Sequence, residues 1–204
     1  MPTLFPRMPV IVFTAVLAGL GSTSAVANIN LVWDPPAQTV EVGETFEIGL
    51  MAVSDSPFAQ SIAALQVILD WEPDKLSLTG SNENGPYEWL HPGFPSGGLN
   101  STWLDGDAWF TALSQLLGPL PFATPEGFLI TTFTFTAEAE TPLTEITIPE
   151  SLGGFTTNIF DGKIPGLDVT GLLGTAEVTI VPDPATLLLV TGGALVLLLR
   201  RRRS

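Results

Sequence analysis

Apolar residues recur at every second position in several separate segments of this 204-residue chain. Successive residues of a β-strand point to opposite faces, so this period of two predicts strands with one buried and one solvated face. Clusters rich in glycine, proline and polar residues separate the segments and predict turns. The alternating apolar positions are Ile29, Leu31 and Trp33; Val40, Val42, Phe46, Ile48 and Leu50; Leu65, Val67, Leu69 and Trp71; Leu129, Phe133 and Phe135; Ile146 and Ile148; and Ala176, Val178 and Ile180.

Many half-buried strands without a long helix predict an all-β fold, an antiparallel β-sandwich. Leu69, Phe133 and Phe135 are predicted core residues because each lies on the apolar parity of its strand. Residues 105–118 fit two structures. Their apolar residues form a helical stripe, while Trp109, Thr111 and Leu113 also fit a strand, which the all-β context favours.

The N-terminal 27 residues have the features of a secretory signal peptide. One basic residue, Arg7, precedes an apolar stretch, and Ala25 and Ala27 form the small-residue pattern that signal peptidase accepts. We therefore assign residues 1–27 to the signal peptide and leave them out of the fold prediction.

The C-terminal residues 181–204 combine a short apolar run with a basic end. The run, residues 185–199, would reach about 22 Å as a helix, less than the roughly 30 Å of a hydrocarbon core. Such a length suits a transient inner-membrane anchor. The arginines at 200–203 predict a cytoplasmic end, which places the preceding domain outside.

This terminus resembles the PEP-CTERM sorting signal of Gram-negative bacteria. The resemblance rests on the triplet Pro182-Asp183-Pro184, the apolar run and the closing cluster Arg200, Arg201, Arg202 and Arg203. The family's usual triplet is Pro-Glu-Pro, so the aspartate is a departure. The resemblance implies recognition by an exosortase, removal of the tail, and delivery to the cell surface or the extracellular polysaccharide matrix.

The remaining region, residues 28–180, is long enough for one domain with a sizeable core. It is strongly acidic: of the chain's 21 Asp and Glu residues, only Asp183 lies outside residues 28–181, which hold two lysines, Lys75 and Lys163. Nucleic acid is therefore not an expected partner, because phosphate binding requires a basic surface. A solvated face that repels its own copies accounts for the charge.

Few residues suit catalysis. The chain has no cysteine, which excludes disulfides, thiolate metal ligands and thiol nucleophiles. A serine–histidine–aspartate triad would have to use the single histidine, His91, whose Gly/Pro-rich neighbours indicate a loop. A glycosidase needs two carboxylates, yet no acidic residue here has a distinguishing context. We predict that the domain is not an enzyme.

Asp105 and Asp107 flank Gly106 and offer two oxygen ligands for calcium. Calcium requires six to eight oxygens, and the same residues are common in ordinary turns. No cofactor is predicted beyond this calcium candidate.

The aromatic residues fall into two groups. Trp33 and Trp71 lie on buried parity and are predicted core residues. The second group lies in Gly/Pro-rich segments that indicate loops. Rings on stiff loops suit stacking on sugars or anchoring a protein interface. Alternatively, these rings fold back over the edge of the sandwich. The candidates for ligand contact are Tyr87, Trp89, Trp103 and Trp109, with Trp89 and Trp103 first.

Four segments together resemble the cohesin domain. They are "VEVGETFEIGLMAV", "IAALQVILDWEPDKLSLTG", "GFLITTFTFTAEAETPLTEITI" and "GTAEVTIV". Cohesins commonly carry Tyr-Asp-Pro at the turn where this chain has Trp71-Glu72-Pro73. The resemblance implies a jelly-roll-like β-sandwich related to carbohydrate-binding modules, with a dockerin-like protein as partner.

These features predict a non-catalytic, exported binding module for a protein or a polysaccharide. The alternatives are a structural matrix component without a specific ligand and, more remotely, an enzyme acting on exopolysaccharide.

Overall fold

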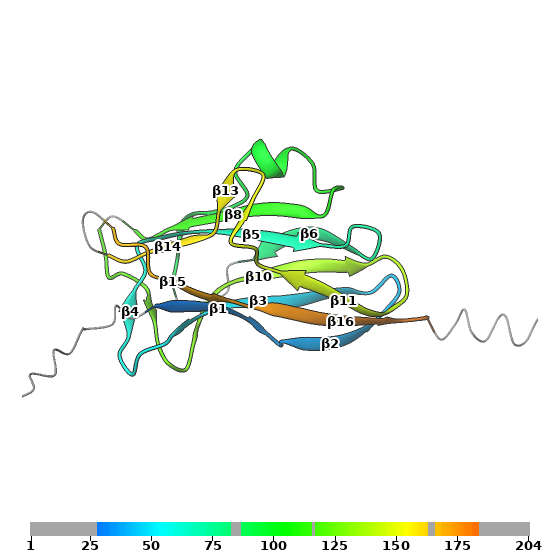
Figure 1. Cartoon of the computed structure of the whole chain (residues 1–204), viewed down its shortest axis with the longest axis horizontal. Helices are drawn as coiled ribbons and strands as arrows, with labels where there is room; N and C mark the ends of the chain where they lie inside the picture. Colours follow the sequence, from blue (N-terminus) through cyan, green and yellow to red (C-terminus); the bar gives the residue numbers. More distant parts are fainter. Residues whose placement is uncertain (1–27, 83–86, 116, 163–165, 184–204) are drawn as a thin grey trace, which may run out of the picture.

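The computed structural model describes residues 28–82, 87–115, 117–162 and 166–183, which form a sandwich of two β-sheets (Figure 1). The first sheet has the strand order β15 (Thr170–Leu173), β1 (Ile29–Asp34), β3 (Thr45–Ser54), β10 (Phe128–Ala137) and β6 (Leu76–Asn82). The second has the order β2 (Ala37–Glu41), β16 (Thr175–Val181), β11 (Thr141–Thr147), β5 (Ala64–Trp71), β8 (Asp107–Leu113) and β7 (Leu90–Gly93), and β14 (Asn158–Phe160) also pairs with β5.

Two short antiparallel strand pairs and one helical turn complete the described structure. β4 (Gln60–Ser61) pairs with β9 (Phe122–Ala123), and β12 (Ser151–Leu152) pairs with β13 (Phe155–Thr156). The helical turn η1 (Gly98–Ser101) is a single 3-10 turn. Within these described ranges no helix is long and apolar enough to cross a membrane. The all-β sandwich predicted from the alternation is confirmed.

The prediction of a wholly antiparallel sandwich is wrong at two pairings. β1 pairs with β15, and β2 with β16, in parallel. The chain passes from the first sheet to the second twice. β1 continues into β2 at Pro35-Pro36, where proline cannot donate a hydrogen bond to a strand ladder. β15 continues into β16 at Gly174. A Cβ at Gly174 would lie 2.9 Å from the Leu31 carbonyl oxygen, so the crossing requires glycine. Two segments that cross together in the same direction must pair in parallel.

The core contains the predicted apolar residues. Leu69, Phe133 and Phe135 are completely buried, and Trp33 and Trp71 are nearly so. Trp71 of β5 meets Phe135 of β10 edge-on with ring centroids 5.5 Å apart, which joins the two sheets. These core predictions are therefore confirmed.

Leu129 departs from its predicted parity because β10 has a bulge. Leu129 pairs with Met51 whereas Thr131 pairs with the adjacent Leu50, so one extra residue, Ile130, lies between them. The extra residue turns Leu129 toward the outer surface, and Ile130 takes the fully buried position.

The segment that fitted both a helix and a strand is the strand β8. Its buried side chains are Ala108, Phe110 and Ala112, so Trp109, Thr111 and Leu113 point outward. The strand prediction is confirmed, and the parity that carries Trp109 and Leu113 is the outer face.

Candidate functional site

Trp89 lies inside the domain and does not reach outward from a loop. Its side chain is 6% exposed, and its Nε1 donates to the Ile130 carbonyl oxygen at 3.0 Å. Tyr87 and Phe128 meet it edge-on. The expectation of an exposed indole at Trp89 is wrong, because the bulge in β10 exposes a carbonyl that the indole satisfies from within.

Trp103 and Tyr87 are half-buried and pack against the core. The Trp103 ring lies 5.1 Å from the ring of Phe94, which in turn contacts Phe110 of the core. The Tyr87 hydroxyl accepts a hydrogen bond from the Gln115 backbone N at 2.8 Å. Both rings therefore close the edge of the sandwich, the alternative considered for these residues.

Trp109 is the candidate ring that lies on a sheet face, and a hairpin covers it. Phe155 packs on it with ring centroids 4.7 Å apart. Phe155 belongs to the β12–β13 hairpin, residues 151–156, which we call the flap. Before the flap the chain pairs with β5 as β11, and after the flap it pairs with β5 again as β14.

Hydrogen bonds attach the base of the flap to β5 and η1 to β8. Thr157 closes the base of the flap, because its Oγ1 donates to the Pro149 carbonyl oxygen at 2.7 Å and accepts from the Ile68 backbone N at 3.1 Å. Asn100 of η1 binds both backbone groups of Trp109, accepting from its N at 2.7 Å and donating to its carbonyl oxygen at 2.8 Å. The flap thus covers the middle of this face, and η1 is bound along the neighbouring edge of β8.

The register of β14, β5, β8 and β7 arranges their outward side chains in rows; we call this surface the β5–β8 face. At the end where β5 begins, one row is apolar across all four strands. Leu90 pairs with Leu113, Leu113 with Ala64, and Ala64 with Phe160. Leu113 is 45% exposed, and the other three are partly exposed. A contiguous apolar row on an open sheet face is a feature of interaction sites.

The next row is uncharged and polar. Thr111 pairs with Gln66, and Gln66 with Asn158. Gln66 Nε2 donates to Asn158 Oδ1 at 2.9 Å, and Asn158 Nδ2 donates to Asp168 Oδ2 at 2.6 Å. This chain of hydrogen bonds holds the amides in fixed orientations beside the apolar row. The following row, Trp109 with Ile68, is the one that the flap covers.

The far end of the face is acidic. Asp70 and Asp107 are direct cross-strand partners. Partial burial raises the pKa of both carboxyls, and the neighbouring charges of Asp105 and Asp70 raise the pKa of Asp107 further. Asp107 Oδ1 is enclosed and has no hydrogen-bond partner in the described structure.

Asp105 and Asp107, the calcium candidates, flank a turn that requires glycine. Gly106 has a φ of +86°, and a Cβ there would lie 2.4 Å from the Trp71 carbonyl oxygen. Its own carbonyl oxygen accepts from the Trp71 backbone N at 2.8 Å. In the described part of the chain no group of three or more His, Asp or Glu side chains could hold a metal ion.

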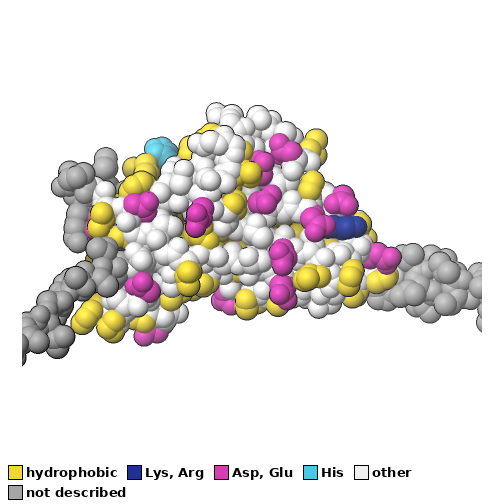
Figure 2. All heavy atoms as spheres, in the orientation of Figure 1, with side chains coloured by type: hydrophobic (Ala, Val, Ile, Leu, Met, Phe, Trp, Pro, Cys, Tyr) yellow, Lys and Arg dark blue, Asp and Glu magenta, His cyan; other side chains and the backbone are white. Residues whose placement is uncertain are grey.

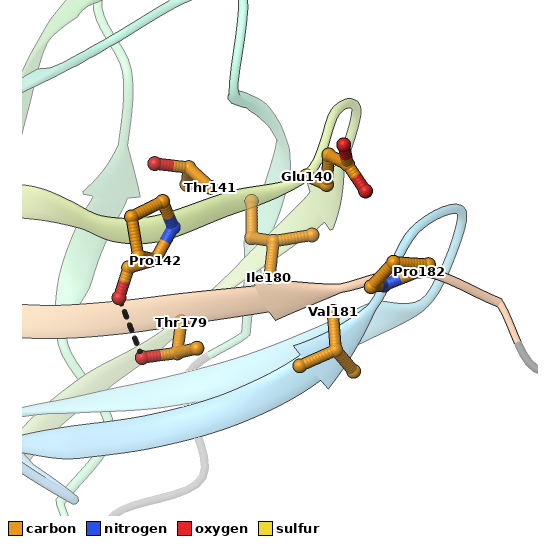
Figure 3. Close-up of a pocket in the computed structure, with 7 residues that line it drawn as sticks. All are labelled: Glu140, Thr141, Pro142, Thr179, Ile180, Val181 and Pro182. Atoms are coloured by element: carbon orange, nitrogen blue, oxygen red, sulfur yellow. Dashed lines mark hydrogen bonds between the residues drawn. The ribbon is translucent and has the colours of Figure 1, made fainter.

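Two shallow grooves mark opposite ends of the second sheet. One, of about 350 Å³, adjoins the apolar row and is lined by Glu88, Trp89, Leu90, Gln115 and Leu117. The other, of about 310 Å³, lies between β11 and the end of β16 (Figure 3) and is lined by Glu140, Thr141, Pro142, Thr179, Ile180, Val181 and Pro182. Both are near the lower size limit of small-molecule sites.

His91 and the acidic side chains lie at the surface. His91 is exposed on the edge strand β7, with a left-handed φ of 52°. Acidic side chains are spread over the visible surface (Figure 2), and Lys75, the one Lys or Arg among the described residues, lies 3.7 Å from Asp74. The surface is acidic as the composition predicts.

Several predicted positions fall outside the described residues. These are Ala25 and Ala27, Pro184, and Arg200 to Arg203. Pro182 is exposed and Asp183 half-exposed at the end of β16, so the predicted sorting triplet begins where the sandwich ends.

The sequence matches no protein-family model and no curated protein, but solved structures share the fold. A cohesin module from a family 33 glycoside hydrolase of Clostridium perfringens is 13% identical, with a TM-score of 0.51 over 77% of this chain and 96% of that one. The sixth cohesin of scaffoldin B from Acetivibrio cellulolyticus, in complex with a Cel5 dockerin, is 12% identical, with a TM-score of 0.56 over 76% of this chain and 99% of that one. The fold is that of a cohesin.

A third structure, the OlpA cohesin of Clostridium thermocellum in complex with dockerin Doc918, gives the same result. It is 11% identical, with a TM-score of 0.53 over 77% of this chain and all of that one. The cohesin-like sandwich suggested by the four sequence segments is therefore confirmed at the level of fold.

The sequence reading missed the β5–β8 face. Leu113, Gln66 and Asn158 come from three strands far apart in the sequence, and only the strand register brings them together. The sequence does contain one indication of this face: Thr111 and Leu113 of β8 alternate with the buried Phe110 and therefore lie on the outward side of the strand.

Proposed function

We propose that residues 28–181 form a non-catalytic protein-binding module whose partner, a dockerin-like protein, docks on the β5–β8 face. The observation that carries this proposal is the apolar row that Leu90, Leu113, Ala64 and Phe160 present across four adjacent strands. The fixed amides beside it supply hydrogen-bonding groups at no further ordering cost. Dockerin complexes of proteins with the same fold support the choice of partner class.

The proposal includes export and surface display. The signal peptide directs the chain out of the cytoplasm, and the C-terminal tail holds it in the inner membrane until an exosortase removes the tail. The described chain begins and finishes at opposite ends of the sandwich (Figure 1). The apolar row lies toward the end opposite the tail, so a tethered domain presents it away from the membrane.

Sugar stacking has less support than protein docking. Of the four candidate rings, Trp89 is buried, Tyr87 and Trp103 close the sandwich edge, and Phe155 covers Trp109. An apolar row of aliphatic side chains favours a protein surface as its complement.

Two matched leucines test the proposal. Leu113 on the β5–β8 face and Leu143 on β11 are 45% and 48% exposed. The domain, as wild type, Leu113→Glu and Leu143→Glu, serves as bait for proteins of the native envelope, and each captured protein is then purified for direct binding. We expect Leu143→Glu to bind like wild type and Leu113→Glu to lose at least tenfold in affinity, since a charge in a desolvated interface costs more than about 1.4 kcal/mol.

Melting temperatures of the two variants provide the control, and they should agree because both side chains are exposed. Equal binding by both variants would exclude the β5–β8 face. Retention on the polysaccharide fraction without any protein partner would overturn the protein-binding proposal.

A further inference from the structure

The first residue of the described sandwich is held by its backbone. The Asn28 backbone N donates to Asp55 Oδ1 at 2.7 Å. Its carbonyl oxygen accepts from the Asp55 backbone N at 3.0 Å and from Gln60 Nε2 at 2.8 Å. The next residue, Ile29, is completely buried in β1. The first described residue, Asn28, therefore has a carboxylate placed against its backbone nitrogen.

The same residue follows the predicted cleavage site. The small residues Ala25 and Ala27 place the cut of signal peptidase between Ala27 and Asn28. Two independent observations, a sequence pattern and a hydrogen-bonded contact, thus coincide at one peptide bond.

We propose that removal of the signal peptide creates an ion pair between the new α-ammonium of Asn28 and the Asp55 carboxylate, which fastens the mature N-terminus to the sandwich. Hydrolysis breaks the C–N bond between Ala27 and Asn28, with water supplying OH to the Ala27 carbonyl carbon and H to the Asn28 nitrogen. The amine then takes up a proton from solvent, as α-amines largely do at neutral pH. The contact between a neutral amide N–H and a carboxylate becomes one between two opposite charges, without movement of the nitrogen.

The surroundings leave Asp55 as the partner of this charge. Lys75, the one Lys or Arg in the described ranges, pairs with Asp74 in the β5–β6 turn and does not compete for Asp55. Gln60 Nε2 also donates to Ser54 Oγ at 2.8 Å, and Ser54 Oγ donates to the Phe58 carbonyl oxygen at 2.8 Å. The loop between β3 and β4 is therefore braced in the shape that presents the carboxylate.

This inference rests on the export part of the proposed function and is independent of partner docking. Its first test is N-terminal sequencing and intact mass of the protein extracted from its native envelope. A mature chain that starts at Asn28 is expected, and a start at any other residue overturns the inference while leaving the β5–β8 face untouched.

The second test measures the ion pair itself. The mature protein is labelled with an amine-reactive reagent at pH 7.5, and the labelling rate of Asn28 is compared with that of the Lys75 side chain by mass spectrometry. The Asp55→Asn variant keeps an oxygen acceptor but loses the charge, so it should fold and label at Asn28 roughly two- to five-fold faster than wild type, as expected for an exposed ion pair.

The matched control is Glu126→Gln. It removes one exposed negative charge from the turn that follows Thr124, whose carbonyl oxygen accepts from the Ser54 backbone N at 3.0 Å. Its labelling rate should equal that of wild type. Equal rates in wild type and Asp55→Asn, or the same acceleration in Glu126→Gln, would mean that no specific pair forms.

Discussion

The outward surface of the second sheet has two halves that share one core and differ outside. The β5–β8 face carries the apolar row, the fixed amides and the flap. The other half, which we call the β11–β16 face, is the outer surface of β2, β16 and β11. Its outward positions are mostly threonines and glutamates, and the apolar exceptions are Ala37, Leu143 and Val181.

The β11–β16 face is built to stay solvated. Glu145 and Glu177 are direct cross-strand partners, both exposed, and like charges in such positions are destabilising. A sheet tolerates this pair where water screens it, and the charge discourages association of copies. The β5–β8 face lacks such a pair beside its apolar row. The two halves thus differ in how their charges are placed: on the β11–β16 face the paired glutamates stand in the middle of the strands, whereas on the β5–β8 face the carboxylates of Asp70, Asp107 and Asp168 flank the apolar and amide rows.

The largest effect should come from the core that both halves share. Phe133 contacts Trp33 and Phe110 edge-on, so it joins the two sheets. Phe133→Ala should lower the free energy of unfolding by about 3–5 kcal/mol, from lost burial and the cavity left behind. Urea denaturation measures this loss, and Thr134→Ala on the outer side should stay within about 0.5 kcal/mol of wild type. A small loss at Phe133 would mean that the two halves do not depend on one core.

A smaller effect is expected at Trp89, below the groove beside the apolar row. Trp89→Phe keeps a ring but leaves the Ile130 carbonyl oxygen without its indole donor, which should cost about 1–3 kcal/mol. Thermal and urea unfolding measure the loss. If stability is unchanged while partner binding falls, Trp89 contacts the partner directly and does not act by stabilising the fold.

The flap should give a third, more local effect. Phe155→Ala removes the ring pair with Trp109 and should cost about 0.5–1.5 kcal/mol beyond lost burial. Hydrogen exchange should accelerate in residues 150–157 and remain unchanged on the β11–β16 face. Leu172→Ala, at a side chain that is 77% exposed, is the control and should leave exchange unaltered. Faster exchange across both faces would show that the flap is part of the global fold.

The alternation of apolar and polar residues was sufficient to predict the sandwich and its central side chains. Leu69, Phe133 and Phe135 are buried because a period of two specifies which face of a strand meets the core. The alternation could not predict Leu129, since a bulge changes the parity within one strand. Parallel pairing of the two crossing segments also depends on contacts between chain ends, which no local pattern records.

The candidate site was much less accessible from the sequence. Gly/Pro-rich context suggested that Trp89 and Trp103 stand on exposed loops, but such loops can also fold a ring inward, and here a free carbonyl on β10 holds one of them there. The apolar row depends on the mutual register of four strands, which is set by long-range pairing. Local alternation specifies which side of each strand is buried, but it does not specify which strands are neighbours in the sheet.

The smallest effect should come from the charged ends of the β5–β8 face. Asp107 and Asp168 are shifted in opposite directions. Partial burial and the charges of Asp105 and Asp70 raise the pKa of Asp107. At Asp168 burial also acts to raise the pKa, but hydrogen bonds from Thr170 and Asn158 outweigh it and hold the pKa below its usual value of 3.8.

The two carboxyls therefore predict opposite pH dependences. For Asp107 the folded state binds the proton more tightly than the unfolded state, so its contribution favours folding below pH 3.8 and is lost as pH rises through the raised pKa. For Asp168 the contribution is present above pH 3.8 and is lost as pH falls through the lowered pKa. At pH 7, Asp107→Asn should raise the melting temperature slightly and Asp168→Asn should lower it; near pH 3 the two differences should shrink. Scanning calorimetry of both variants from pH 3 to 7 measures this. A fall in melting temperature for Asp107→Asn at pH 7 would mean that its carboxylate is held by a favourable contact, and the acidic end of the face would then contribute to the fold.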